Sequence, residues 1–297
     1  WEQRTGIGVS APKVDAFEKA IGQHPYVDDL RFDGMLHGAL RFSQHPRARV
    51  LGIDVAAAEK MPGVIRVFTA ADVPGERYQG LKVKDWPIYV AVGEETRCIG
   101  DVICGVVASS EALARQAAAA IQVDYEILEP LTEMTQAADS AVRVHSGGNL
   151  LKETVVCRGE PVADLFAAAG HVVTGQFETP FVEHGFLETE ASIAVPGDAG
   201  GLTVYSQNQG IFADRQQIAN LLNLPETAVD VIQVAAGGGF GGKEDLTVQH
   251  HAALFSLALQ RPVKVHLSRP ESLRMHPKRH RMKLDYTLAC DAGGRLT

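Results

Sequence analysis

The sequence lacks long hydrophobic runs and contains few cysteines and few aromatic residues. No stretch of its 297 residues approaches the roughly 20 apolar residues of a membrane-spanning helix, so no membrane association is expected. The four cysteines are widely scattered, at Cys98, Cys104, Cys157 and Cys290. Because no two of them form a C-x-x-C pair, neither a zinc site nor an iron–sulfur cluster is predicted within this chain. Scattered cysteines without a signal-peptide pattern are typical of a cytoplasmic protein.

Basic residues are also fewer than acidic ones. The chain has 28 Lys and Arg against 36 Asp and Glu, which gives a formal net charge of -8. An acidic chain is a poor match for nucleic acid, so nucleic acid is not expected as the main partner. One basic cluster, at residues 278–281, has no interleaved aromatic residues and is interpreted as the solvated entrance of a strand. The overall composition, 45% hydrophobic and 22% charged, is that of a globular protein.

The chain order predicts an α+β fold in two domains. Residues 1–22 contain several Gly and Pro with little periodicity and are interpreted as a tether from an upstream domain. Residues 23–130 alternate predicted strands and helices, including a helix that starts after the N-cap residue Ser110. A polar segment at 131–150 is interpreted as a linker, and residues 151–297 form the second domain.

The two ends of the sequence suggest part of a longer protein. The first residue is Trp1 rather than Met. At the other end, a predicted strand at 282–290 and a turn at 291–294 are followed by only three residues of a return strand. Such a short return strand would leave most of a hairpin edge unpaired, so we expect a fragment cut at both ends.

The most informative stretch is residues 237–244, Gly-Gly-Gly-Phe-Gly-Gly-Lys-Glu. Residues 229–234 before it are predicted to form a buried strand, and residues 244–259 after it a helix. Five glycines between a strand and a helix indicate positive φ angles or the close approach of a ligand to the backbone. Since helix N-termini carry unpaired N–H groups and partial positive charge, this stretch predicts a cradle for an anion or an oxo group.

Two other interpretations of the glycine stretch stay open at this point. One is a plain connector without a ligand. The other is a nucleotide-binding P-loop, because residues 237–243 match the pattern G-x-x-x-x-G-K. Glu244 counts against a P-loop, since it stands where Ser or Thr should bind magnesium and its carboxylate would repel a triphosphate.

Five blocks in one collinear order resemble the molybdenum hydroxylase family, which includes xanthine dehydrogenases and aldehyde oxidoreductases. The blocks are residues 45–75, 100–126, 183–189 (EHGFLET), 206–208 (SQN) and 237–244. The resemblance covers nearly the whole chain and is closest to xanthine dehydrogenase-like members. It implies an α/β hammerhead domain followed by the first part of a molybdopterin-binding domain.

The resemblance also implies a reaction and its partners. It implies an oxidoreductase that hydroxylates an electron-poor carbon with water as the oxygen source, on a molybdenum–molybdopterin cofactor. Iron–sulfur clusters would lie in another domain or subunit, and the general base in the remainder of the molybdenum domain. We therefore expect no catalytic residue and no direct metal ligand in this chain, and no turnover by the chain alone. The family also implies a homodimer. An aldehyde-type substrate, and a split subunit or assembly module completed by a partner chain, remain as alternatives.

Cofactor contacts are implied for one side chain and for the glycine stretch. Gln207 matches the glutamine whose side-chain amide donates to the metal's oxo ligand. Gly238, Gly239, Phe240 and Gly241 match positions whose backbone approaches that ligand. Backbone N–H groups suit this task because they are rigid and already oriented. A Cβ atom at these positions would hold the cofactor away, which would explain the glycines.

Glu244 matches the glutamate with which xanthine-oxidising members hold the purine ring, whereas aldehyde oxidases tend to carry an apolar residue. The resemblance therefore implies a purine-like small molecule as the substrate. The alternative is that Glu244 is an acidic first-turn residue of the following helix. Glu188 is interpreted as ordering a loop near the cofactor. The adjacent His250 and His251 would point about 100° apart on a helix, so they are interpreted as packing or surface residues.

Overall fold

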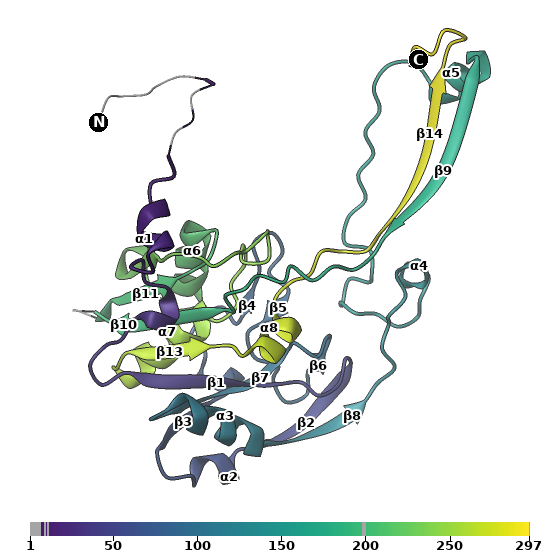
Figure 1. The fold of residues 1–297 in the computed structure, drawn as a ribbon. Helices are drawn as coiled ribbons and strands as arrows, with labels where there is room; N and C mark the ends of the chain where they lie inside the picture. The colour runs from purple at the N-terminus through teal and green to yellow at the C-terminus, as the bar shows by residue number, and fades with distance from the viewer. Residues whose placement is uncertain (1–6, 9, 11, 198–199, 297) are drawn as a thin grey trace. The chain divides into compact units, whose positions relative to one another are not determined.

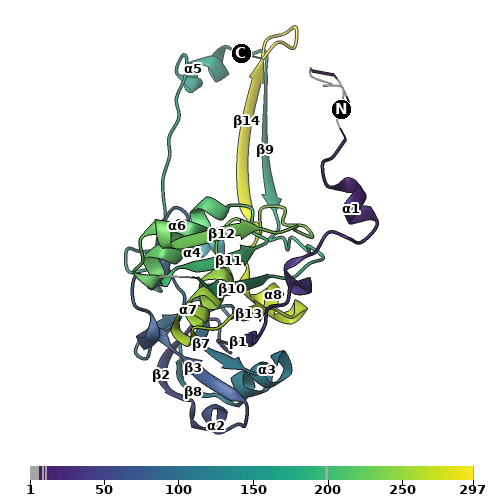
Figure 2. The same ribbon diagram turned by 90° about the vertical axis from the view of Figure 1, so that its left-hand side faces the viewer.

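The computed structural model describes residues 7, 8, 10, 12–197 and 200–296 of the chain (Figures 1 and 2). These residues form two compact units. The sheet unit comprises the described residues up to Leu128 together with Gly185–His276. The ribbon unit comprises Glu129–His184 together with the described residues from Pro277 onward. The sequence-based boundaries follow chain order, whereas these units interleave, because Gly185–His276 adds strands to the sheet begun by the first 128 residues.

A seven-stranded mixed sheet forms the centre of the sheet unit. Its strand order is β12 (Val229–Gln233), β11 (Leu202–Ser206), β10 (Ala191–Pro196), β13 (Val263–His266), β1 (Leu36–Phe42), β7 (Val102–Ala108) and β3 (Val64–Phe68). Strands β1 and β13 are parallel and join the two parts of the chain. Strands β11 and β12 are also parallel, and the other neighbouring strands are antiparallel.

The remaining elements of the sheet unit are two small sheets and several helices. The small sheets pair β2 (Ala48–Asp54) with β6 (Glu95–Thr96) and β8 (Gln122–Ile127), and β4 (Tyr78–Gln79) with β5 (Trp86–Pro87). The α-helices are α1 (Ala16–Ala20), α2 (Ala56–Glu59), α3 (Glu111–Ala120), α6 (Ile211–Leu222), α7 (Gln249–Leu259) and α8 (Arg269–Met275). Short 3-10 helices cover Val27–Asp29, Ala70–Asp72 and Glu226–Ala228.

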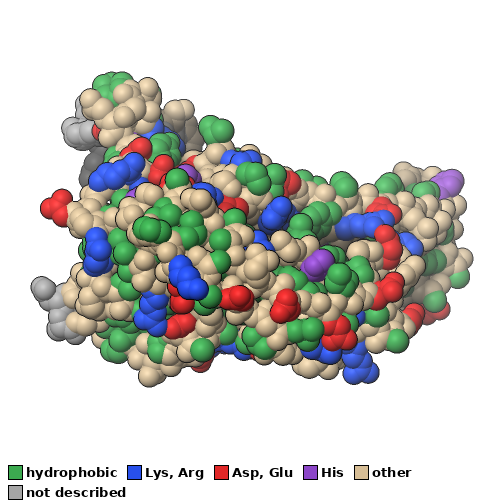
Figure 3. Space-filling view, turned by 90° about the horizontal axis from the view of Figure 1, so that it is seen from below, with side chains coloured by type: hydrophobic (Ala, Val, Ile, Leu, Met, Phe, Trp, Pro, Cys, Tyr) green, Lys and Arg blue, Asp and Glu red, His purple; other side chains and the backbone are tan. Residues whose placement is uncertain are grey.

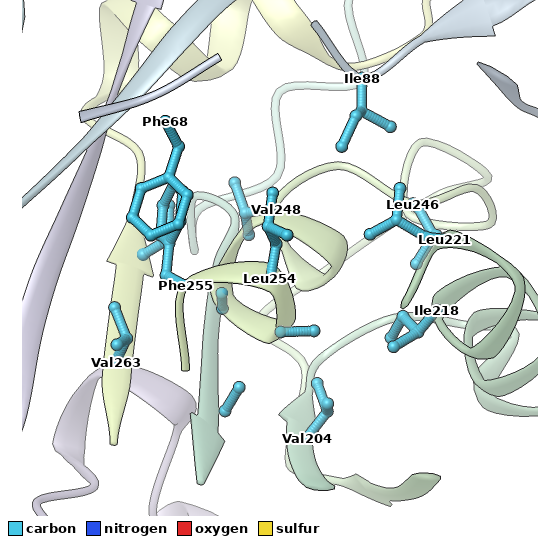
Figure 4. Close-up of a cluster of buried hydrophobic side chains, with 14 of the residues drawn as sticks. Phe68, Ile88, Val204, Ile218, Leu221, Leu246, Val248, Leu254, Phe255 and Val263 are labelled. Carbon is cyan, nitrogen blue, oxygen red and sulfur yellow. The ribbon is translucent and has the colours of Figure 1, made fainter. Parts of the chain in front are cut away.

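Helix α7 packs on the central sheet and supplies much of the core. Figure 4 shows Leu254 and Phe255 of α7 among buried side chains from the strands and from α6. The rings of Phe255 and Phe68 lie 4.7 Å apart between centroids. Glycines at Gly38 in β1 and Gly105 in β7 leave the space that the Phe255 ring occupies. This packing fixes α7, and with it the segment that precedes α7, against the sheet.

The ribbon unit contains a long two-stranded antiparallel ribbon. Strand β9 (His171–Thr179) pairs over its whole length with β14 (Met282–Cys290), and the two run side by side in Figures 1 and 2. Two short helices, α4 (Met134–Ala137) and α5 (Val162–Ala168), belong to the same unit. The rings of Phe177 and Tyr286 meet on one face of the ribbon, with centroids 5.8 Å apart.

Two elements beside the glycine stretch differ from the sequence-based expectation. Strand β12 was expected to be buried, but it is the edge strand of the sheet, and Ile232 is 45% exposed. The following helix was expected from residue 244, but α7 begins at Gln249. The side chain of Gln249 accepts hydrogen bonds from the N–H groups of Thr247 and Val248, which holds the preceding residues out of the helix.

Charge is mixed on the face shown in Figure 3, where basic and acidic side chains alternate without a large area of one sign. Among the described residues, no helix combines the length and the apolar character needed to cross a membrane.

Candidate functional site

The glycine stretch forms an irregular loop between β12 and α7. Gly238 has φ +103° and Gly241 has φ +86°, in the left-handed region that favours glycine. Phe240 has φ +53°, which is uncommon for a bulky residue, and its side chain is 74% exposed. Among the described residues, the N–H groups of Gly238, Gly239 and Phe240 donate no hydrogen bond. Three successive unpaired N–H groups on such a backbone can bind an anionic or electron-rich group.

Three of the glycines pack closely against the protein itself. A Cβ atom on Gly237 would lie 2.5 Å from the Cβ atom of Glu188. One on Gly238 would lie 3.0 Å from the Cβ atom of Phe186. One on Gly239 would lie 2.6 Å from Oε1 of Gln209. The sequence-based explanation was a positive φ or the close approach of a ligand, and these contacts beneath the loop are a further reason for small residues. The approach of a cofactor to this backbone stays a prediction. Gly241, with no atom near its Cβ position, faces open space.

Glu188 holds the start of the loop. Its Oε2 accepts a hydrogen bond of 2.6 Å from the N–H of Gly237, and its own N–H donates to the Gly237 carbonyl at 3.3 Å. Both bonds confirm the expectation that Glu188 orders a loop.

Gln209 holds the end of the loop, and the sequence analysis missed it. Its Oε1 accepts from the N–H groups of Gly241, at 3.1 Å, and Lys243, at 3.4 Å. Its backbone N–H donates to the Lys243 carbonyl at 2.7 Å. No local pattern marks Gln209, because its partners lie more than 30 residues away.

Lys243 is completely buried beneath the loop. Its ammonium donates to the Glu188 carbonyl at 2.9 Å and to Gln207 Oε1, lies 3.4 Å from Glu188 Oε2, and is 4.5 Å from the centroid of the Phe186 ring. Burial lowers the pKa of Lys243, while the nearby Glu188 carboxylate opposes this shift. The ammonium is fully used within the protein, so it cannot reach a phosphate group. This contradicts the P-loop interpretation, in which the lysine contacts the nucleotide.

Gln207 is also buried, and its amide is occupied by the protein. Nε2 donates to the carbonyls of Thr189, at 2.7 Å, and Ala191, at 3.4 Å. Oε1 accepts from Lys243. The structure therefore connects Gln207 to the glycine loop through Lys243 and Glu188. Its predicted donation to a cofactor stays a prediction, which requires one of the two Nε2 protons to leave its carbonyl partner.

A buried polar network fixes the segment that carries Gln207. Ser206 Oγ and Asn208 Nδ2 donate to the two carboxylate oxygens of Asp214, at 3.0 and 2.9 Å. Burial raises the pKa of Asp214 to about 6, although these two hydrogen bonds oppose the shift. Because Asp214 lies in the first turn of α6, the network attaches the residues on both sides of Gln207 to that helix.

Glu244 lies on the exposed side of the loop end. Among the described residues, its carboxylate makes no hydrogen bond or ion pair. The alternative role as a first-turn residue of the helix is wrong, because α7 begins at Gln249 and the dipole effect is confined to the first turn.

The two adjacent histidines are packing residues. His250 and His251 are both buried, with ring centroids 4.2 Å apart, and His251 Nδ1 lies 3.1 Å from the Tyr89 hydroxyl. Burial lowers the pKa of His250 to about 3, so its ring is neutral. Packing is confirmed, and the alternative surface position is excluded.

Two parts of the chain match known domain families. Residues 21–129 match the aldehyde oxidase and xanthine dehydrogenase a/b hammerhead domain. Residues 144–297, more than half of the chain, match the molybdopterin cofactor-binding domain. The chain belongs to the molybdenum hydroxylase family. The predicted α+β fold, a hammerhead domain followed by a molybdopterin-binding domain, is confirmed, and so is molybdopterin as the cofactor of this domain type.

Relatives of this molybdenum hydroxylase chain carry different substrate names. It is 37% identical over 288 residues to a probable xanthine dehydrogenase subunit of Bacillus subtilis (strain 168), covering 97% of this chain and 38% of that protein. It is 33% identical over 291 residues to the nicotinate dehydrogenase large molybdopterin subunit of Eubacterium barkeri, covering 98% of this chain and 68% of that protein. The solved aldehyde oxidoreductase from Desulfovibrio gigas has 30% identity and a TM-score of 0.90, covering 96% of this chain and 33% of that one.

Proposed function

We propose that this molybdenum hydroxylase chain is part of an enzyme that oxidises a purine or related N-heterocycle at an electron-poor carbon. Water would supply the oxygen, so that the carbon–hydrogen bond becomes a carbon–hydroxyl bond with release of two protons and two electrons. Two relatives are named for xanthine and nicotinate, both N-heterocycles. The electrons would pass to iron–sulfur clusters in another domain or subunit, and the remainder of the molybdenum domain would supply the general base.

The observation that carries this proposal is that the N–H groups of Gly238, Gly239 and Phe240 donate to no acceptor in the described part of the chain. Glu188 and Gln209 hold the two ends of the loop, so these donors are oriented before any ligand binds. They would donate hydrogen bonds to electron-rich ligands of the molybdenum–molybdopterin cofactor, which supplies the two-electron oxidation. Donors fixed in advance cost no reorganisation when charge develops. The residues present therefore fit the cofactor that the family implies.

Glu244 would bind the substrate beside that loop. A carboxylate without a protein partner can accept hydrogen bonds from ring N–H groups, or donate one when protonated. An aliphatic aldehyde offers no such donor, so Glu244 favours a heterocycle over the aldehyde-type alternative. That alternative keeps some support from the aldehyde oxidoreductase structure, and a split subunit completed by a partner chain remains compatible with the same loop.

A single substitution tests the substrate assignment. In the full-length protein, Glu244→Val should lower kcat/KM for xanthine or nicotinate by about 10- to 100-fold, the effect of losing one hydrogen bond to a charged group. Oxidation of a simple aldehyde should change much less. Glu226→Val, at an exposed glutamate outside the loop, is the matched control and should leave both rates unchanged. Unchanged heterocycle oxidation in Glu244→Val would reject the binding role.

A further inference from the structure

The ammonium of Lys243 has all of its hydrogen-bonding capacity matched inside the protein. A lysine ammonium carries three donors and no acceptor. The neighbouring acceptors are the Glu188 carbonyl at 2.9 Å, Glu188 Oε2 at 3.4 Å, and Gln207 Oε1. The Phe186 ring closes the site at 4.5 Å. Burying a charge is costly unless it is paired, so the complete pairing of this ammonium indicates a specific structural role beneath the loop.

The same ammonium, together with the Thr189 and Ala191 carbonyls, decides which way the Gln207 amide points. The two ends of an amide have nearly the same shape, but only the nitrogen donates. Because an ammonium cannot accept, only Oε1 can face Lys243, and Nε2 must face the opposite side. The Nε2 bond to Thr189 is short, at 2.7 Å, whereas the bond to Ala191 is long, at 3.4 Å, and is the one more easily exchanged for a ligand.

Lys243 also links the two ends of the glycine loop. It follows the loop in sequence, and its ammonium lies 3.4 Å from the carboxylate oxygen that accepts the Gly237 N–H at 2.6 Å. If the ammonium were removed, the Glu188 carboxylate, whose side chain is 15% exposed, would lose its counter-charge. The position of Gly237 therefore depends on Lys243 through Glu188.

From these contacts we propose that Lys243 is a positioning residue of the cofactor site, which fixes the Gln207 amide with its nitrogen as the donor and clamps the glycine loop through Glu188. The role toward the cofactor rests on the proposed function, but the effect of Lys243 on the glycine loop can be measured whether or not a cofactor is bound.

Four variants of the full-length protein separate the two effects. Lys243→Met removes the donors and leaves Glu188 unpaired. Lys243→Arg keeps the charge. Lys243→Met combined with Glu188→Gln removes the charge pair, while a glutamine oxygen at 188 can still accept from Gly237. Gln207→Glu keeps an acceptor for Lys243 but removes the amide donor.

The first readout is hydrogen exchange of a peptide covering residues 237–243, together with the melting temperature. Lys243→Met should raise exchange in this peptide by about tenfold or more, while a peptide covering α7 changes little. Lys243→Arg and the double variant should exchange within a few-fold of wild type. Wild-type exchange in Lys243→Met would overturn the clamp, whether or not the protein holds molybdenum.

The second readout is molybdenum retained per chain after dialysis. Lys243→Met and Gln207→Glu should each retain about 10- to 100-fold less than wild type, the usual effect of losing a residue that orients a metal site. The double variant should regain its melting temperature but not its molybdenum, because Gln207 Oε1 has lost its ammonium partner and only the Thr189 and Ala191 carbonyls still orient the amide. Full recovery of molybdenum in the double variant would overturn the orienting role. A wild-type protein without molybdenum would instead reject the proposed function.

Discussion

Phe240 is one of the described non-glycine residues with a positive φ angle. A bulky side chain at φ +53° costs on the order of 1 to 3 kcal/mol, and the 74% exposed ring gains little packing in return. The conformation persists because the residues on either side are held, Gly237 by Glu188 and Gly241 by Gln209. Backbone strain maintained in this way is typical of ligand-binding sites, and here it leaves the Phe240 N–H without an acceptor among the described residues.

Asp214 gives a residue-scale prediction about pH. Its pKa of about 6 in the folded protein lies above the ordinary value of 3.8, because burial disfavours the charged form. Between these values the folded protein holds a proton that the unfolded chain has released. The contribution to stability is therefore present below pH 4 and is lost as pH rises through 6, by about 3 kcal/mol.

Asp214→Asn should remove this dependence. An asparagine can still accept from Asn208 and can donate to the Ser206 hydroxyl. The melting temperature of the variant, measured relative to wild type in the full-length protein, should rise between pH 4 and pH 7. Asp230→Asn on the exposed edge strand removes the same formal charge and is the control. A constant difference for Asp214→Asn across this range would contradict a raised pKa.

The residues of the site were only partly predictable from the sequence. The glycine stretch was predicted from its own residues, and Gln207 and Glu244 through motifs that resemble a known family, while their roles toward cofactor and substrate stay predictions. The contacts that hold them were not predicted, because Gln209 meets the loop across a long sequence separation. Lys243 was noted as a motif residue, but nothing in the sequence shows that its ammonium is buried on Gln207 and Glu188.

At the scale of elements, local sequence signals predicted features that do not depend on long-range strand pairing. Ser110 was expected to cap a helix, and its Oγ accepts from the Leu113 N–H at the start of α3. The predicted start of α7 was wrong because the side chain of Gln249 accepts hydrogen bonds from the N–H groups of Thr247 and Val248. The prediction that β12 is buried was wrong because an apolar run does not reveal whether a strand lies at the edge of a sheet.

Gly105 gives an element-scale prediction about the packing of α7 on β7. A Cβ atom at this position would lie 2.8 Å from the Tyr89 hydroxyl and 3.0 Å from Phe255 Cε1, and closer still to Phe255 Cζ. Gly105→Ala should therefore destabilise the protein by about 1 to 3 kcal/mol through overpacking.

The melting temperature of the full-length protein measures this effect. Gly52→Ala in β2 is the control, since its Cβ would meet only the Asp124 side chain, at 3.4 Å from a carboxylate oxygen and 3.9 Å from its Cβ. Adding Phe255→Leu to Gly105→Ala should recover part of the loss. Equal melting temperatures for Gly105→Ala and Gly52→Ala would contradict the packing described for α7.

At the scale of the molecule, the two family domains share one sheet. Strand β1, from the hammerhead part of the chain, pairs with β13 from the molybdopterin-binding part. The sequence pattern predicts these parts as two separate domains, but in the structure their strands pair in one sheet. The pairing was not predictable, because no local signal specifies which distant strand completes a sheet edge. The shared sheet fixes the position of the glycine loop, because β12 before the loop belongs to the sheet and α7 after the loop packs on it.

The central claim is that the backbone of this loop holds part of a molybdopterin cofactor. The most direct test is the molybdenum and pterin content of the purified full-length protein, compared with Gly239→Ala. The added Cβ would lie 2.6 Å from Gln209 Oε1 and 2.9 Å from its Cδ, so the side chain that holds the end of the loop would have to shift. Gly147→Ala, where the Cβ position is open, is the control. We expect bound molybdenum and pterin in wild type and in Gly147→Ala, and loss of most of both in Gly239→Ala. Wild-type protein without molybdenum, or full retention in Gly239→Ala, would contradict the account.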